Sequence, residues 1–200
     1  MAATALFVID IQNDLAKDPN TRITHAERIK TAGKKILTAA RALIDNKTGP
    51  TDRGGGMTCI LFVQHEEDPE AGALVRGTEP WKLVFEPRAA IDREILVAKT
   101  TRDTFESNPN LADNLKAHGV EEVVVFGIQS ECCVESTCRG VLRAGFGVTV
   151  LSGAHSTYDT KEKSAVEIER EVEGRLQEGG AKVVGWEEAV AVWEREGKEN

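Results

Sequence analysis

The chain has 200 residues, 40% of them hydrophobic, and a formal net charge of −8 at pH 7. This length predicts a single domain, residues 1–200, that buries a core without disulfides or a metal. The negative charge argues against nucleic acid and anionic membrane as partners, and no apolar run approaches the roughly 18 residues of a membrane helix. There is no basic region before the first apolar run, and four cysteines, two adjacent, do not suggest a secreted disulfide framework. We therefore expect a cytoplasmic protein with a small-molecule substrate.

Apolar runs of strand length alternate with helical patterns in the first half of the chain. Strands are expected at Ala5–Ile9, Cys59–Val63 and Ile95–Ala98. An amphipathic helix is expected at His25–Ile44, and a polar loop at Asn46–Gly56. Thr24 and Glu27 have the spacing of a capping box at the start of this helix.

The same alternation continues in the second half. A helix at Leu111–His118 follows Asn108-Pro109 and ends at Gly119. Strands are expected at Val123–Phe126 (ended by Gly127), Gly147–Leu151 and Lys182–Val184. Helices are expected from Ser130 or Glu131 to about Ala144, at Thr160–Gln177 and at Trp186–Trp193. The acidic tail Glu194–Glu199 is expected to fray. Together these patterns predict an α/β protein, a three-layer α/β/α fold with a six-stranded, mostly parallel sheet.

Reactive side chains stand at the ends of four expected strands. They are Asp10, Gln64 with His65, Lys99 and, after a tight turn, Cys133. Because ligands bind beyond the carboxyl ends of parallel strands, we expect these residues to converge on one edge of the sheet.

An acid, a lysine and a cysteine in such positions suit nucleophilic catalysis. A thiolate attacks a carbonyl carbon, while Asp10 can take the thiol proton and return it to a leaving amine. Lys99 can hold both groups by its charge. The first turn of a helix is expected to lower the pKa of the Cys133 thiol, because the positive end of the helix dipole stabilises a thiolate.

Each residue also has a plainer interpretation. Asp10 can cap a turn after a strand, and Lys99 can be a solvated strand end. A buried cysteine is usually an inert part of the core, which is our interpretation of Cys59 and Cys138.

Three stretches resemble the isochorismatase-like cysteine hydrolases. They are FVIDIQND (Phe7–Asp14), LVAKTTRDTF (Leu96–Phe105) and GIQSECCVESTCRGVLRAGFGVTVLSGAHST (Gly127–Thr157). The resemblance implies that Asp10, Lys99 and Cys133 form a catalytic triad. Cys133 would be the nucleophile rather than Cys132, because Cys133-Val134 matches the Cys-Val of the motif.

The resemblance also implies an oxyanion hole and a fold. The backbone N–H groups of Gln129 and Cys133 would bind the oxyanion, and the Ile128–Gln129 peptide bond would be cis. The fold would be the six-stranded parallel sheet with helices on both sides that the patterns predict independently.

Five side chains are candidates for substrate binding: Gln12, His65, Trp81, Phe105 and Tyr158. For the aromatic residues, core packing is an equally open interpretation, and His65 can simply end a strand. The related nicotinamidases carry an Asp-x-His and a second histidine that bind a metal. This chain has only His65 there, so we expect no metal and no other cofactor. The family commonly has Phe at the position of Leu15 and an acid at that of Gly153.

The expected activity is hydrolysis of a small amide, carbamoyl or ureido substrate through a thioester intermediate. Alternatives within the resembling group are a nicotinamidase and an isochorismatase-type vinyl-ether hydrolase, the latter disfavoured because that chemistry does not need Cys133. An alternative from another class is a non-catalytic binding or redox-sensing module on the same fold. We also expect a homo-oligomer, a dimer or a tetramer.

Overall fold

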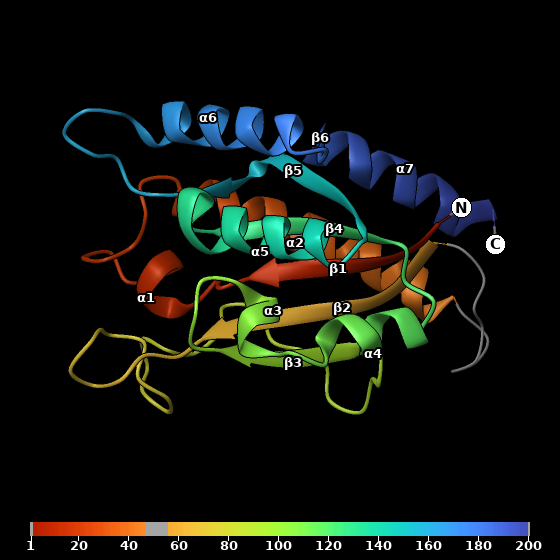
Figure 1. Ribbon diagram of the computed structural model, residues 1–200, viewed down its shortest axis with the longest axis horizontal. Coiled ribbons are helices and arrows are strands. Elements are labelled where there is room, and N and C mark those ends of the chain that lie inside the picture. The colour runs from red at the N-terminus through yellow and green to blue at the C-terminus, as the bar shows by residue number, and fades with distance from the viewer. Residues whose placement is uncertain (1, 47–55, 200) are drawn as a thin grey trace.

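The computed structural model describes residues 2–46 and 56–199, which form a central sheet covered by helices (Figure 1). The sheet has six strands in the order β3-β2-β1-β4-β5-β6, and every neighbouring pair is parallel. The strands are β1 (Ala3–Ile9), β2 (Gly56–His65), β3 (Glu94–Lys99), β4 (Glu122–Ile128), β5 (Gly147–Ser156) and β6 (Lys182–Gly185). The α/β/α prediction is confirmed, and the sheet is parallel throughout.

Two hydrophobic layers sandwich the sheet. Along β1, Leu6 and Val8 face one layer, while Phe7 and Ile9 face the other. This alternation follows from the two-residue period of a strand, and it makes β1 apolar throughout because both of its faces are covered.

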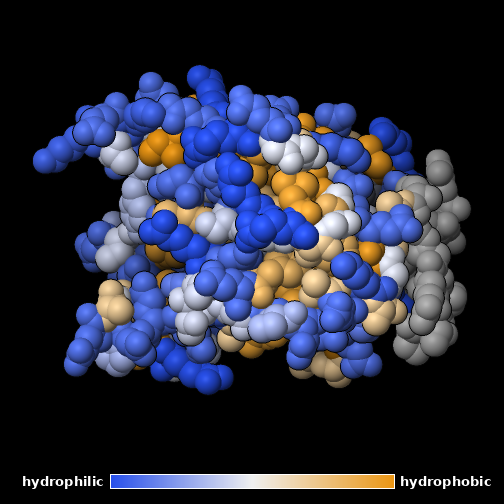
Figure 2. All heavy atoms as spheres, in the orientation of Figure 1, coloured by the Kyte–Doolittle hydropathy of each residue, from blue (hydrophilic) through white to orange (hydrophobic). Residues whose placement is uncertain are grey.

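Seven helices and one π-helical turn complete the described part of the chain. They are α1 (Asn13–Ala16), α2 (Ala26–Asp45), α3 (Thr104–Ser107), α4 (Leu111–Ala117), the turn η1 (Ser130–Val134), α5 (Glu135–Arg143), α6 (Ala165–Glu178) and α7 (Trp186–Glu199). The sequence did not predict α1 and α3, because four residues are too few to show a helical period. Where Figure 2 shows the region of α6, hydrophilic side chains predominate, as expected for this charged helix.

The predicted capping box at Thr24 and Glu27 is wrong. The Thr24 hydroxyl donates to Asp159 at 3.0 Å, and α2 begins without a side-chain cap. Glu27 accepts from Arg22 at 2.7 Å instead. Thr24 is therefore used in a tertiary contact to the segment after β5, which the local spacing did not indicate.

A capping box does start α6. Ser164 and Glu167 bond to each other's backbone N–H groups, so the helix begins at Ala165 rather than at Thr160. At the other end of the chain, the tail expected to fray is helical, because α7 continues to Glu199.

Gly127 does not end its strand, as the sequence suggested, because β4 runs on to Ile128. Gly127 has a φ of 141°, and a Cβ there would lie 2.1 Å from the carbonyl oxygen of Ile9. Only glycine permits this close approach of β4 to β1. The Ile128–Gln129 peptide bond that follows is cis, as predicted.

Three further expectations concern the polar loop, two cysteines and the absence of membrane helices. Residues 47–55, most of the predicted polar loop, lie outside the described residues. Cys59 and Cys138 are buried in the core, as predicted. Among the described residues, the helices are all too short or too polar to cross a membrane.

Candidate active site

Four strand ends bring the predicted reactive residues together. Asp10 follows β1 with a φ of 49°, and its N–H donates to the Val63 carbonyl at 3.0 Å. His65 and Lys99 end β2 and β3 and are partners in the sheet register. Cys133 lies in η1, called here the cysteine turn, between β4 and α5. Since β1 and β4 are neighbours at the point where the strand order reverses, this is the position at which such sheets bind ligands.

The Lys99 ammonium lies at the centre of this group. It contacts the Asp10 Oδ2 at 2.7 Å, the His65 Nδ1 at 3.0 Å and the Cys133 Sγ at 3.2 Å. It also donates to the Thr101 carbonyl at 3.2 Å. Asp10 and Lys99 are each only 1% exposed. An ammonium has three protons for these four acceptors, so the hydrogen bonds can redistribute when a charge forms nearby.

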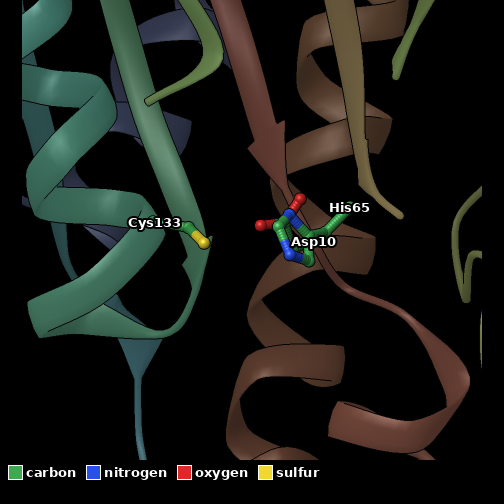
Figure 3. Close-up of side chains that lie close together, drawn as sticks. All are labelled: Asp10, His65 and Cys133. Carbon is green, nitrogen blue, oxygen red and sulfur yellow. The ribbon is translucent and has the colours of Figure 1, made fainter. Parts of the chain in front are cut away.

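The reactive atoms of Asp10, His65 and Cys133 face one another (Figure 3) and lie within 4.8 Å of each other. The Asp10 Oδ1 has no hydrogen-bond partner among the described residues, although it is buried. An unpaired buried carboxylate oxygen is costly to keep, and such oxygens are characteristic of groups that accept a proton during a reaction.

The prediction of a lowered thiol pKa is wrong. Burial raises the pKa of the Cys133 thiol, the Asp10 carboxylate raises it further, and the Lys99 ammonium offsets only part of the increase. Desolvation therefore outweighs the position of Cys133 at the start of a helix. Cys133 therefore rests as a thiol, and any attack by its thiolate requires a base to take the proton.

Lysine and histidine have opposite protonation states here. Burial disfavours the Lys99 ammonium, but the neighbouring Asp10 carboxylate and Cys133 outweigh this effect and hold the pKa of Lys99 above its usual value. Burial, reinforced by Lys99, lowers the pKa of His65, so its imidazole is neutral at pH 7. Since an ammonium can only donate, the His65 Nδ1 accepts and the ring proton is on Nε2.

Gln12 supports the site from within the core. It is fully buried, its Nε2 donates to the carbonyls of His65 (3.0 Å) and Trp81 (2.7 Å), and its Oε1 accepts from the His65 N–H at 2.9 Å. Its amide is thus occupied in holding the end of β2 against the segment around Trp81.

The three aromatic candidates lie in different surroundings. Trp81 is tied to the site by Gln12 and Gln64, and its buried Nε1 has no acceptor among the described residues. The Phe105 ring stacks on Phe7 at a centroid distance of 6.1 Å and packs against the same core cluster as Cys133. Tyr158 donates to the Thr21 carbonyl at 2.5 Å and so connects the segment after β5 to the start of α2.

A family model, the isochorismatase domain, matches residues 4–188 of the chain. The chain belongs to the isochorismatase family. The match includes the strand ends that carry Asp10, Lys99 and Cys133, and the family predicted from the three sequence stretches is confirmed.

Three relatives of this family member are hydrolases by name. It is 33% identical over 156 residues to streptothricin hydrolase of Streptomyces noursei, a match that covers 78% of this chain and 55% of that protein. It is 27% identical to nicotinamidase 3 of Arabidopsis thaliana over 78% of this chain and 74% of that protein. It is 28% identical to ureidoacrylate amidohydrolase of Yersinia enterocolitica over 77% of this chain and 76% of that protein.

The chain thus spans about half the length of streptothricin hydrolase.

Solved structures share the fold of this family member. The crystal structure of a cysteine hydrolase from Pseudomonas syringae superposes with a TM-score of 0.79 at 19% identity, covering 96% of this chain and 92% of that one.

The structure gives a physical reason for one departure from the family pattern. Gly153, where the family commonly has an acid, has a φ of 78°, and a Cβ there would lie 3.1 Å from the Trp186 ring. A larger side chain is therefore strained at this position. Leu15, the other departure, packs against the core formed with α2.

The site fits a metal ion poorly. Asp10, His65 and Cys133 offer three ligand atoms, but the Lys99 ammonium already contacts all three residues. A cation bound there would have to displace a buried positive charge that these same groups stabilise. The group contains one histidine, His65, rather than the two that the resemblance implied for a nicotinamidase-type metal site.

Three further residues at the cysteine turn were not predicted from the sequence: Ser130 and His155, which are buried, and Glu173, which is partly buried. The available signal was His155, one of only four histidines, in a strand that ends beside the cysteine. Its partner Glu173 lies in the helix predicted over Thr160–Gln177, where nothing distinguished it from the other acidic residues.

Proposed function

We propose that this protein is a cysteine-dependent hydrolase that cleaves a C–N bond of a small amide, carbamoyl or ureido substrate through a thioester. The observation that carries the proposal is the buried Lys99 ammonium in contact with both Asp10, at 2.7 Å, and Cys133, at 3.2 Å. A lysine that served only structure would not need a thiol partner, whereas a nucleophile and its base need a fixed charge between them.

Acylation begins with transfer of the thiol proton from Cys133 to Asp10. The sulfur attacks the carbonyl carbon, and the backbone N–H groups of Gln129 and Cys133 bind the oxyanion, while Lys99 stabilises the negative charge near the sulfur. The raised pKa of the thiol makes this proton transfer necessary. When the tetrahedral intermediate collapses, the C–N bond breaks, Asp10 returns the proton to the leaving nitrogen, and a thioester remains.

In deacylation, Asp10 acts first as a base and then as an acid. Asp10 takes a proton from a water molecule, whose oxygen attacks the thioester carbonyl. Collapse breaks the C–S bond, the sulfur recovers the proton from Asp10, and the carboxylic acid leaves. Each cycle therefore consumes one water and leaves all three residues unchanged.

His65 and Trp81 are the proposed substrate contacts. The neutral His65 keeps its Nε2 proton on the side away from Lys99, and the Trp81 Nε1 proton has no protein acceptor. Both are donors, which suits a substrate with carbonyl or carboxylate oxygens next to the cleaved bond.

The relatives support the C–N class by their names. A nicotinamidase and a ureidoacrylate amidohydrolase both suggest hydrolysis at an amide-type bond. Nicotinamide is the first compound to test as an alternative substrate, with and without a chelator; chelator-sensitive turnover would identify a metal-dependent nicotinamidase. The vinyl-ether and redox-sensing alternatives have no support from the geometry of the described residues beyond the shared fold.

The experiment is a screen of small amides, ureas and carbamates with ammonia detection, combined with intact mass spectrometry. Cys133→Ala should abolish ammonia release and the acyl adduct. Cys132→Ala is the matched control, because it removes the adjacent thiol and should retain activity. A Cys133→Ala enzyme with wild-type turnover would refute the proposal. The expected dimer or tetramer stays a prediction, which light scattering after size-exclusion chromatography tests.

A further inference from the structure

A second chain of polar side chains lies behind the cysteine turn. The Ser130 Oγ is 2.8 Å from the His155 Nδ1, and the His155 Nε2 is 3.1 Å from the Glu173 Oε1. Ser130 and His155 are both 0% exposed. The order serine, histidine, carboxylate matches a catalytic triad, but a hydroxyl with no exposed surface cannot reach a substrate. The group must act on the protein itself.

A bulge in β5 places His155 beside the cysteine turn. The register of β4 and β5 pairs Val125 with Val150 and then jumps, so that Gly127 pairs with His155. Gly153, inside the bulge, has a positive φ. His155 thus flanks the last residues of β4, directly before Gln129 and Ser130.

The carboxylate of Glu173 sets the direction of the hydrogen bonds. Burial alone would raise the pKa of Glu173, but hydrogen bonds from His155 and Ser152 outweigh it and hold the pKa below its usual value. A carboxylate can only accept, so the His155 Nε2 carries a proton. On the other side of the ring, Nδ1 is hydrogen-bonded to the Ser130 hydroxyl.

Ser130 is the first residue of the cysteine turn, which is closed by hydrogen bonds to the carbonyls of Gln129 and of Ser130 itself. The Gln129 carbonyl accepts from the N–H groups of Cys132 and Val134 at 3.2 and 3.1 Å. The Ser130 carbonyl accepts from the N–H of Glu135, where α5 begins. A change in the orientation of Ser130 would therefore move the backbone of Gln129 on one side and that of Cys133 on the other.

We propose that Glu173, His155 and Ser130 are positioning residues that fix the cysteine turn, so that the N–H groups of Gln129 and Cys133 remain directed at the oxyanion. Glu173 orients His155, and His155 holds Ser130. This inference rests on the proposed cysteine hydrolase and adds to it residues that never touch the substrate.

The test compares two reactions of the same thiol in the full-length protein. Acetylation by p-nitrophenyl acetate forms a C–S bond, releases p-nitrophenolate and passes through an oxyanion. Alkylation by iodoacetamide forms a C–S bond and releases iodide without an oxyanion. Damage to the turn that misplaces the N–H groups should slow the first reaction and spare the second.

Ser130→Ala and Ser156→Ala form a matched pair. Ser156 is the next residue after His155, is equally buried, and bonds to Glu169 of α6 at 2.5 Å. Both substitutions remove one buried serine hydrogen bond, and Ser156→Ala, which loses a bond to a carboxylate, should cost at least as much thermal stability as Ser130→Ala. We expect Ser130→Ala to slow acetylation about tenfold or more with alkylation almost unchanged, and Ser156→Ala to leave both rates near those of the wild type.

Two variants of His155 separate its two hydrogen bonds. In His155→Asn, the amide oxygen can take the place of Nδ1 and accept from Ser130. In His155→Gln, the amide nitrogen can take the place of Nε2 and donate to Glu173, while the bond to Ser130 is lost. We expect the Asn variant to be acetylated faster than the Gln variant.

Several results would overturn the inference. Equal acetylation rates for the two serine variants, or for the two His155 variants, would show that the hydrogen bonds serve stability alone. A parallel loss of acetylation and alkylation in Ser130→Ala would show an effect on the thiol rather than on the oxyanion. If Cys133→Ala is acetylated as fast as the wild type, the proposed function fails first.

Discussion

Strand β3 has an ion pair with a buried carboxylate at each end, and the two pairs differ in a way that separates structure from chemistry. At its start, the Glu94 carboxylate accepts from Arg41 Nε and NH2 at 3.0 and 2.8 Å, and from Arg88 N and Nε at 2.8 and 2.6 Å. At its end, Lys99 meets Asp10, whose Oδ1 has no partner among the described residues.

The difference concerns what remains for a ligand. Both carboxylate oxygens of Glu94 accept hydrogen bonds from arginine. Arg41 thereby joins β3 to α2, and Arg88 joins β3 to the segment that precedes this strand. Asp10 retains an unused oxygen, and Lys99 has more acceptors than protons. Complete hydrogen bonding marks a structural ion pair, whereas incomplete hydrogen bonding in a buried pair marks a site prepared for a reaction.

The largest expected effect comes from removing the charge of Asp10. Asp10→Asn should lower turnover about 10³-fold or more, because the thiol loses its base and the leaving nitrogen its acid. Lys99 retains His65, Thr101 and Cys133 as acceptors, so the protein should stay folded. Steady-state rates and circular dichroism check both statements; a variant with wild-type turnover would contradict the role of Asp10.

The corresponding change at the other end of β3 should affect stability and spare activity. Glu94→Gln leaves Arg41 and Arg88 without a counter-charge, and we expect a loss of about 1–2 kcal/mol in the free energy of unfolding. The loss is moderate because the two arginine side chains are 26% and 32% exposed. Urea unfolding measures it, with kcat of the same preparation as the control. A large fall in kcat at unchanged stability would reverse the comparison.

Acid should remove the contribution of Glu94. Burial alone would raise its pKa, but hydrogen bonds from Arg41 and Arg88 outweigh burial and hold the pKa of Glu94 below its usual 4.5. A lowered pKa in the folded state means that the stabilisation is complete above the unfolded-state pKa and is lost as the pH falls through the folded-state value. The stability difference between wild type and Glu94→Gln should therefore shrink below about pH 4.5. A difference that grows in acid would contradict this sign.

The smallest effect should be seen in the reactivity of the thiol. The Asp10 carboxylate adds to the burial that raises the pKa of Cys133. Asp10→Asn should therefore shift the pH profile of iodoacetamide alkylation at Cys133 towards lower pH, even though turnover is lost. Peptide mass spectrometry at Cys133, with Cys132 as the internal reference, measures the profile. A shift towards higher pH would show that Asp10 does not act on the thiol by its charge.

The strands, the long helices and the residues at the strand ends could be predicted from the sequence, because hydrophobic periodicity and local turn chemistry act over a few residues. Two-sided apolar strands such as β1 also determined the parallel sheet. The motif stretches with Asp10, Lys99 and Cys133 were sufficient to indicate the family.

How these residues act on one another depends on the folded arrangement and could not be predicted. The sheet order brought Lys99 beside His65 and Cys133, and burial reversed the expected shift of the thiol pKa. Thr24 bonds to Asp159 instead of capping α2, and a bulge in β5 places His155 beside Ser130. Each of these outcomes depends on distances between segments far apart in the chain and on solvent excluded by all of them together, which no local pattern of residues contains.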